Sequence, residues 1–279
     1  MAANVAAAGF PLTVWTHTPG KAARWASEHG ATAATTPAEV ASASDIVVSM
    51  VVDGAQVSEI LLGEEGVLGA GRTGLLCSDC STIAPSQTRR IGAALSERGV
   101  GMLDAPVTGS SPRAEDGSLT IMVGGEVDEF ARAKPLLDSM GSLVVHVGEL
   151  GQGEMLKLIN NALGAANAAA LAEALLLARA SGIDLDDLVR VLTAGSGASA
   201  QLELKSTPMR EHDFTPLFKL DHMLKDVRLC VEEAQAAGVP FPSAGHARDL
   251  LVAASGRGLG DQDYAAMIEA AEGLAGLRL

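Results

Sequence analysis

Lys157 and Asn161 have residue types and a spacing that suggest a catalytic or binding role. They lie four positions apart in a segment, Glu154 to Ala180, whose pattern and lack of proline predict one long helix. Side chains at this spacing share a helix face, and Gly164 and Ala165 continue that face with small residues. An amine on such a face needs an anionic partner or a chemical role, and it can exchange a proton with a substrate hydroxyl. The alternative is a lysine that extends to solvent at the helix start.

A second segment, Asp104-Ala-Pro-Val-Thr-Gly-Ser-Ser111, lies at the carboxyl end of an expected parallel strand. Ligands of open α/β sheets bind outside the carboxyl ends of the strands. Thr108, Gly109 and Ser110 offer hydroxyls and accessible backbone N–H groups, which suit a carboxylate. An ordinary turn rich in proline and glycine explains the same residues equally well.

The third segment contains Phe218, Lys225 and Asp226. Their spacings of seven and eight place them on one broad helical stripe. The alternative is a solvated amphipathic helix, and the pattern by itself favours that alternative.

Strands and helices alternate in the first half of the chain, whereas helices alone follow in the second half. Asp45 to Val52 is a continuous apolar run, as in a strand buried on both faces. The alternation indicates βαβ units and predicts an α/β fold with a Rossmann-like, mostly parallel, doubly wound sheet. The pattern changes near Gly148 to Gly153, so we expect an α/β domain at 1–150 and an all-helical domain at 151–279, with the long helix joining them.

Short motifs near these segments are less specific. Gly69-Ala-Gly-Arg-Thr-Gly74 matches the dinucleotide fingerprint in letters, but it follows a helix and precedes a strand, so we expect a surface loop. Gly151-Gln-Gly153 precedes a helix, and its amides could face an anion. Cys77 and Cys80 point to opposite faces of an expected strand, and a zinc site would need four ligands. We expect no metal site.

Charge and composition exclude several classes of partner. Lys plus Arg is 20 and Asp plus Glu is 34, so the net charge is −14, which argues against nucleic acid and anionic membranes. Three cysteines fit a reducing compartment, and no secretory signal is visible. The most apolar stretch, Leu158 to Ala172, is too short to span a bilayer. We therefore expect a cytoplasmic protein.

The three segments, taken in order, resemble a known family over essentially the whole chain. The chain resembles a β-hydroxyacid dehydrogenase of the 3-hydroxyisobutyrate dehydrogenase and glyoxylate/succinic semialdehyde reductase group. The segment from Asp104, together with Ala114 to Gly125, resembles the family's substrate-binding segment, and 151–161 resembles its catalytic helix. Asp79 to Pro85 resembles its nicotinamide-side loop, and Met50 to Asp53 occupies the position of another cofactor loop.

The resemblance implies an oxidoreductase that transfers a hydride between NAD(P)(H) and a small β-hydroxyacid or carboxylate-bearing aldehyde. Lys157 would be the general acid in reduction and the base in oxidation, Asn161 would orient it, and the dinucleotide-binding and helical domains would close over the cofactor. The implied substrate-binding residues are Thr108, Gly109, Ser110 and Asp226, and the implied cofactor-binding residues are Thr16, His17, Met50, Val51, Thr82, Phe218 and Lys225.

The chain departs from the family pattern in four places. The family begins with a strand and a Gly-rich phosphate loop that are missing here; we expect either a longer native product or impaired cofactor binding. Thr108 replaces the usual Ser, which narrows the space for substrate. Ser110 and Arg113 stand where many 3-hydroxyisobutyrate enzymes have glycine, and Ser110 with the run Ala114-Glu-Asp-Gly117 resembles the semialdehyde reductase branch. His17 stands where an acid would select NAD and an Arg would select NADP, so NADP is the preferred cofactor and NAD the alternative.

Two other functions remain open on the sequence. A non-catalytic, oligomerising or regulatory chain of the same fold is favoured only by the missing Gly-rich loop. An imine reductase of the same fold is disfavoured by Lys157, because those relatives lack the catalytic lysine. The long Ala-rich helix has more apolar faces than one domain can cover, so we also expect a homodimer or homotetramer.

Overall fold

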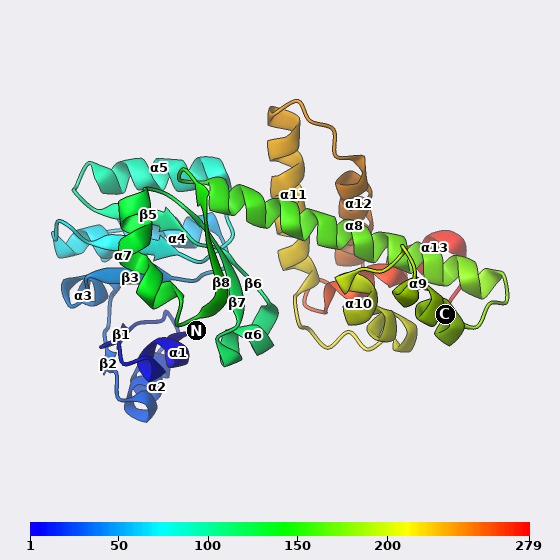
Figure 1. Cartoon of the computed structure of the whole chain (residues 1–279), viewed down its shortest axis with the longest axis horizontal. Coiled ribbons are helices and arrows are strands. Elements are labelled where there is room, and N and C mark those ends of the chain that lie inside the picture. The colour runs from blue at the N-terminus through cyan, green and yellow to red at the C-terminus, as the bar shows by residue number, and fades with distance from the viewer. The chain divides into compact units, whose positions relative to one another are not determined.

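Short apolar strands form the centre of the first of two units. The computed structural model describes residues 1–279, and the chain divides into Met1–Lys157 and Leu158–Leu279 (Figure 1). A six-stranded sheet has the order β3-β4-β5-β7-β6, with β8 beside β7. Its strands are β3 (Ile46–Ser49), β4 (Leu76–Asp79), β5 (Gly101–Asp104), β6 (Val107–Thr108), β7 (Leu119–Gly124) and β8 (Gly141–Gly148).

The register of this sheet brings three strand ends together. β3, β4 and β5 pair in parallel, so that Ser49, Asp79 and Asp104 end their strands side by side. β8 is parallel to β7, whereas β5 and β6 each pair with β7 in the antiparallel sense. Two further strands, β1 (Thr13–Val14) and β2 (Thr32–Ala33), form a separate parallel pair.

Helices cover both faces of the six-stranded sheet, which confirms the expected doubly wound α/β architecture. One apolar cluster joins Val57 and Ile91 to Cys77, and another joins Leu137 to Cys80. The two cysteines therefore face opposite sides, as expected, and burial raises the pKa of Cys77 to about 12. The helices are α1 (Ala2–Ala7), α2 (Lys21–His29), α3 (Pro37–Ser42), α4 (Gly54–Leu62), η1 (Val67–Ala70), α5 (Pro85–Ser96), α6 (Ser110–Asp116) and α7 (Val127–Leu137).

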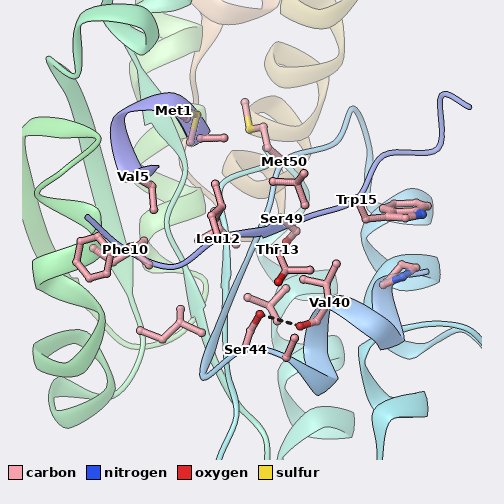
Figure 2. A pocket seen from close by; sticks show the side chains of 18 of the residues that line it. Met1, Val5, Phe10, Leu12, Thr13, Trp15, Val40, Ser44, Ser49 and Met50 are labelled. Atoms are coloured by element: carbon pink, nitrogen blue, oxygen red, sulfur yellow. Dashed lines mark hydrogen bonds between the residues drawn. The ribbon is translucent and has the colours of Figure 1, made fainter. Parts of the chain in front are cut away.

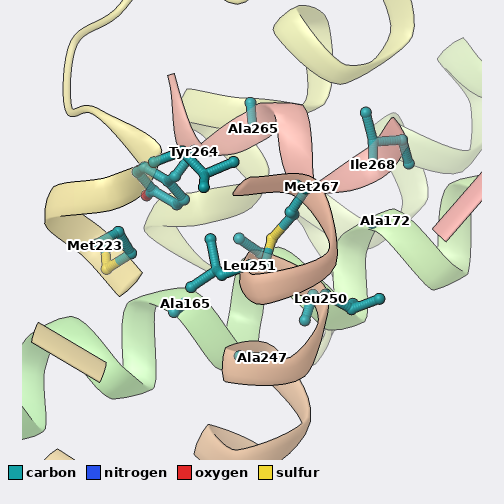
Figure 3. Packing of buried hydrophobic residues seen from close by; sticks show 14 of the residues in the cluster. Ala165, Ala172, Met223, Ala247, Leu250, Leu251, Tyr264, Ala265, Met267 and Ile268 are labelled. Atoms are coloured by element: carbon teal, nitrogen blue, oxygen red, sulfur yellow. The ribbon is translucent and has the colours of Figure 1, made fainter. Parts of the chain in front are cut away.

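The second unit is entirely helical, as the sequence predicts. Its core packs α8, α11, α12 and α13 through small and aliphatic residues such as Ala165, Leu251 and Ile268 (Figure 3). Alanines on α8 allow this close approach because their side chains add little volume. The helices are α8 (Gln152–Ala180), α9 (Leu185–Ala194), α10 (Ala200–Glu211), α11 (Leu220–Ala236), α12 (Pro242–Gly256), η2 (Tyr264–Ala266) and α13 (Met267–Ala275).

Helix α8 connects the two units and begins in the first of them. The units divide between Lys157 and Leu158, within α8, whereas the expected division into 1–150 and 151–279 precedes the helix. α8 is also the one helix long and apolar enough to cross a membrane by length and composition, so the expectation that its apolar stretch is too short was wrong. More than half of its most apolar window is buried inside the protein, as in a core helix.

Candidate functional site

A pocket in the first unit brings together four of the expected cofactor-binding residues. Thr16, His17, Met50 and Val51 line it just beyond the carboxyl ends of β1 and β3, and its volume is about 670 Å³. Figure 2 shows Met50 at this pocket with Ser49 and Trp15. This is where ligands of open α/β sheets bind.

Only one part of the pocket, formed by Thr16, His17, Met50 and Val51, has residues suited to a nicotinamide dinucleotide; the rest of its lining is largely apolar and comes from segments such as those of Leu12, Ile46 and Met140. The volume of the whole pocket lies within the range of small-molecule sites, roughly 300–1,000 Å³. Its walls are mostly apolar, and Met50 is 56% exposed. No acid occupies positions 16–18 after β1, where a carboxylate would bind the ribose 2′-hydroxyl, whereas His17 and Lys21 are exposed there. Thr82 follows β4, is partly buried and does not line this pocket.

Asp79 lies at the end of β4 beneath this edge and is completely buried. Its Oδ1 accepts hydrogen bonds from the hydroxyls of Ser49 and Ser81, each at 2.7 Å. Its Oδ2 is buried and has no hydrogen-bond partner. Burial raises the pKa of the Asp79 carboxyl, hydrogen bonds from Ser81 and Ser49 oppose that rise, and nearby Asp104 adds to it. A neutral carboxyl is the form that such an environment favours.

The raised pKa of Asp79 predicts a pH-dependent stability. Between the ordinary and the raised pKa, the folded chain retains a proton that the unfolded chain releases, so this group's stabilising contribution falls as pH rises. Asp79→Asn removes the titration, and we expect it to increase the free energy of unfolding at neutral pH by about 1–3 kcal/mol, with a smaller gain in acid.

Both tryptophans, Trp15 and Trp25, lie in the first unit, so denaturant titration with tryptophan fluorescence at several pH values follows the unfolding of that unit. Glu28→Gln, at an exposed position of the same unit, is the matched control. An Asp79→Asn variant whose stability follows the same pH profile as the wild type would contradict the assignment.

The Asp104 carboxylate caps the N-terminus of α8. Its Oδ1 accepts the backbone N–H of Gly151 and its Oδ2 that of Glu154, both at 2.7 Å. Asp104 is fully buried, and its burial raises the pKa of the carboxyl against the effect of these hydrogen bonds. From the sequence, we expected that backbone amides of the Gly151-Gln-Gly153 turn could face an anion. In the structure the side chain of Asp104 accepts hydrogen bonds from the amides of Gly151 and Glu154. The sequence reasoning did not assign this role to Asp104.

The segment after Asp104 has an unusual backbone. Thr108 ends β6, Gly109 has φ +136°, and Ser110, the first residue of α6, has φ +57°. Non-glycine residues rarely adopt that left-handed conformation, and such strain is concentrated at binding sites. Thr108 and Gly109 are partly buried and Ser110 is exposed, so all three are accessible to a ligand.

In the second unit, Asn161 and Asp226 form a buried pair. Asn161 Nδ2 donates to Asp226 Oδ2 at 2.6 Å, and Lys225 Nζ lies 3.0 Å from Asp226 Oδ1. Asn161 is 6% and Asp226 1% exposed, so the amide is fixed in orientation by an interaction shielded from water. Lys157 precedes Asn161 by one turn of α8 and is 7% exposed, so the alternative that it extends to solvent is wrong.

Phe218 is not on the expected helical stripe. α11 begins at Leu220, and Phe218 lies in the preceding loop, so the helical spacing from Phe218 to Lys225 was wrong. Phe218 instead contacts Tyr264 and His222 edge to face, with ring centroids 6.4 and 6.0 Å apart. The Gly69 to Gly74 motif begins with the last two residues of η1 and continues as a largely exposed loop before β4, where we expected a surface loop.

His212, Glu269 and Glu272 are residues of types that can bind a metal ion, and one potential ligand atom from each lies within 4.8 Å of the others. Both glutamates already have cationic partners. Arg278 lies 3.3 Å from Glu269 and 3.7 Å from Glu272, and Arg257 lies 3.5 Å from Glu269. The cluster is explained by these ion pairs.

Comparison with known proteins identifies the family. Residues 1–148 match the family model described as the NAD binding domain of 6-phosphogluconate dehydrogenase. Residues 151–271 match the model described as NAD-binding of NADP-dependent 3-hydroxyisobutyrate dehydrogenase. The chain is 36% identical to 2-hydroxy-3-oxopropionate reductase of Escherichia coli K12, over 100% of this chain and 95% of that protein. The chain belongs to the β-hydroxyacid dehydrogenase family.

Solved structures of this β-hydroxyacid dehydrogenase family have the same fold. A 3-hydroxyisobutyrate dehydrogenase from Salmonella typhimurium superposes with a TM-score of 0.86 at 33% identity, covering 96% of this chain and 94% of that one. The Mycobacterium tuberculosis 3-hydroxyisobutyrate dehydrogenase, solved with L-serine, gives 0.87 at 30% identity, covering 96% and 93%. The chain is therefore an oxidoreductase of the 3-hydroxyisobutyrate dehydrogenase type that acts on CH–OH groups with NAD or NADP. These relatives do not favour the non-catalytic or imine reductase alternatives.

Proposed function

We propose that Lys157 is the general acid and base of this dehydrogenase. The proposal rests on the burial of the Lys157 amine one helical turn before Asn161. The side-chain amide of Asn161 is held in place by the buried carboxylate of Asp226. In reduction Lys157 donates a proton to the oxygen that becomes the hydroxyl, and in oxidation it removes that proton. Asn161 orients the substrate oxygen and Lys157, and Asp226 fixes Asn161. The nicotinamide cofactor, when bound, supplies or accepts the hydride.

The substrate of the proposed reaction is a small β-hydroxyacid or the matching carboxylate-bearing aldehyde. Thr108, Gly109 and Ser110 bind its carboxylate through hydroxyls and backbone N–H groups. The support is their accessibility and the left-handed conformation of Ser110, which exposes the backbone of a tight turn. Asp226 acts on the substrate through Asn161, whose side-chain amide donates a hydrogen bond to it.

We propose NADP as the preferred cofactor. Thr16, His17, Met50, Val51 and Thr82 of the first unit, with Phe218 and Lys225 of the second, are the residues that would hold it. The preference rests on the lack of an acid after β1 and on the exposed side chains of His17 and Lys21 near that position.

The proposed substrate class is tested with pairs of aldehydes that differ only in a carboxylate. Turnover is followed by the absorbance of NADPH or NADH. We expect kcat/KM for the carboxylate-bearing member to exceed that of its methyl-ester analogue by about 10²-fold or more, because a site built for an anion leaves its donors unpaired with the ester. NADPH should give a higher kcat/KM than NADH. Equal kcat/KM for the acid and the ester would contradict the carboxylate site.

The proposed assembly is a homodimer or homotetramer in the cytoplasm. Leu156, Ile159, Leu163 and Leu177 are 40–68% exposed and lie at helical spacing on one face of α8. An apolar stripe of this kind favours a contact with a second copy. Leu163→Glu should shift the sedimentation coefficient toward that of the monomer, whereas Leu274→Glu, at an 81% exposed position of α13, should not. A wild-type monomer in sedimentation would contradict the proposal.

A further inference from the structure

Residues 213–219 connect α10 to α11 with little regular structure of their own, and most of them are exposed. Phe218, which the proposed function places against the cofactor, lies in this segment. An exposed segment without its own hydrogen-bonded ladder takes its conformation from whatever anchors its backbone. What anchors it here is a buried carboxylate, Asp263, contributed by the chain just before η2.

Asp263 uses both carboxylate oxygens to fix this segment. Its Oδ2 accepts the backbone N–H of Leu217 at 3.0 Å and that of Phe218 at 3.1 Å. Its own N–H donates to the carbonyl oxygen of Phe214 at 2.9 Å, and the N–H of Tyr264 donates to that of Phe218 at 3.1 Å. The backbone of Phe218 is therefore held on both sides by two consecutive residues.

The charge of Asp263 is balanced by a buried lysine. Lys205 Nζ lies 2.7 Å from Asp263 Oδ1, which also accepts the N–H of Ala265 at 2.9 Å. Lys205 and Asp263 are each 3% exposed at the side chain, and the Lys205 ammonium also lies 4.1 Å from the centre of the Tyr264 ring. A buried ion pair is stable only with such complete hydrogen bonding, and removal of one partner leaves an uncompensated charge.

The network also reaches α8. The Tyr264 hydroxyl donates to Gln201 Oε1. A Cβ added to Gly164 would lie 3.3 Å from Gln201 Nε2, so the Gln201 side chain lies against the glycine that follows Asn161 on the same helix face. The anchor of the Phe218 segment is thus continuous with the face of α8 that carries Asn161.

We propose that Asp263, with Lys205 as its counter-ion, is a positioning residue that fixes Phe218 for cofactor binding. This role rests on the proposed function, because it acts through the contact of Phe218 with the cofactor. Loss of the Asp263 acceptor leaves only backbone hydrogen bonds to hold the backbone of Phe218. The cofactor must then order the segment on binding, and it binds more weakly. The proton transfer assigned to Lys157 is left intact. The signature is a raised KM for the cofactor with little change in kcat.

The test compares Asp263→Asn with the wild type at a temperature at which circular dichroism shows both fully folded. The single oxygen of the asparagine amide cannot accept all four hydrogen bonds that Asp263 accepts, from the ammonium of Lys205 and from the backbone N–H groups of Leu217, Phe218 and Ala265. We therefore expect KM and Kd for NADPH to rise about tenfold and kcat to change by less than about threefold. Hydrogen exchange of the Leu217 and Phe218 amides should accelerate in the variant. Asp249→Asn is the matched control, because Asp249 is exposed on α12 and pairs with Arg248 of the same helix.

A double-mutant cycle separates positioning from general stability. Phe218→Leu alone should raise the same KM, and adding Asp263→Asn to it should raise KM little further, because both act through one side chain. Additive effects, or an unchanged KM in folded Asp263→Asn, would overturn the role of Asp263. If Asp263→Asn does not fold, Lys205→Arg, which keeps the charge, should retain KM within about threefold while Lys205→Met raises it. A wild-type chain that binds no NADP would overturn the proposed function together with this role.

Discussion

Lys157→Met should lower kcat for carbonyl reduction by about 10²–10⁴-fold, the usual contribution of a positioned general acid. Methionine keeps the length and burial of the side chain but has no proton to donate. The position is 7% exposed, so the methionine is buried as the lysine is, and circular dichroism shows whether the variant is folded before its kinetics are measured. The Kd of NADPH should change by less than about threefold, because the lysine acts on the substrate oxygen rather than on the cofactor.

Lys134→Met is the matched control for this substitution. Lys134 is on α7, its side chain is 45% exposed, and its partner is Asp138 at 2.6 Å. It should leave kcat and Kd unchanged. Undiminished kcat in folded Lys157→Met would remove Lys157 from the chemistry and leave its burial without a functional reason.

Asp104→Ala should have the largest effect on stability, lowering the free energy of unfolding of the first unit by about 3 kcal/mol. The alanine leaves the N–H groups of Gly151 and Glu154 without their acceptor in a fully buried place. Asp104→Asn retains one acceptor oxygen and should cost less. Tryptophan fluorescence during denaturant unfolding measures the change, since both tryptophans lie in this unit.

Asp53→Ala gives the comparison for an ordinary helix cap. Asp53 caps α4 by accepting the N–H of Gln56 at 2.9 Å, and it is only partly buried. Its loss should cost about 1 kcal/mol. If Asp104→Ala costs no more than Asp53→Ala, the carboxylate is not what holds the start of α8.

The elements that the sequence predicted well are those with strong local periodicity. The expected strand within Asp45 to Val52 contains β3, and the expected helix from Glu154 to Ala180 lies within α8, which begins two residues earlier. Continuous apolar runs identify strands buried on both faces, and these determine the sheet. The helix α10, Ala200–Glu211, was missed because polar residues and Pro208 interrupt its pattern. Ser199, which caps it by accepting the N–H of Leu202, was the available signal.

The parts of the site that depend on long-range contacts could not be predicted. Asp104 reaches amides about fifty positions further along the chain, and Asn161 meets Asp226 sixty-five positions away. The segment around Asp104 was predicted as a strand end with a candidate carboxylate site, but the antiparallel pairing of β5 with β7 was not predicted. Phe218 was singled out by a helical spacing that was wrong, and its expected cofactor role came from the resemblance. Its backbone N–H in the loop is bound by Asp263, which no local pattern connects to it.

The central claim is hydride transfer between the nicotinamide cofactor and the hydroxyl-bearing carbon of a small carboxylate. It is tested most directly with NADPH that carries deuterium at the transferring position of its ring and a carboxylate-bearing aldehyde such as succinic semialdehyde. Mass spectrometry and NMR of the product should show one deuterium on the carbon that bears the new hydroxyl, and Lys157→Met should form that product far more slowly. A product without deuterium at that carbon, or no product with any carboxylate-bearing aldehyde, would contradict the account.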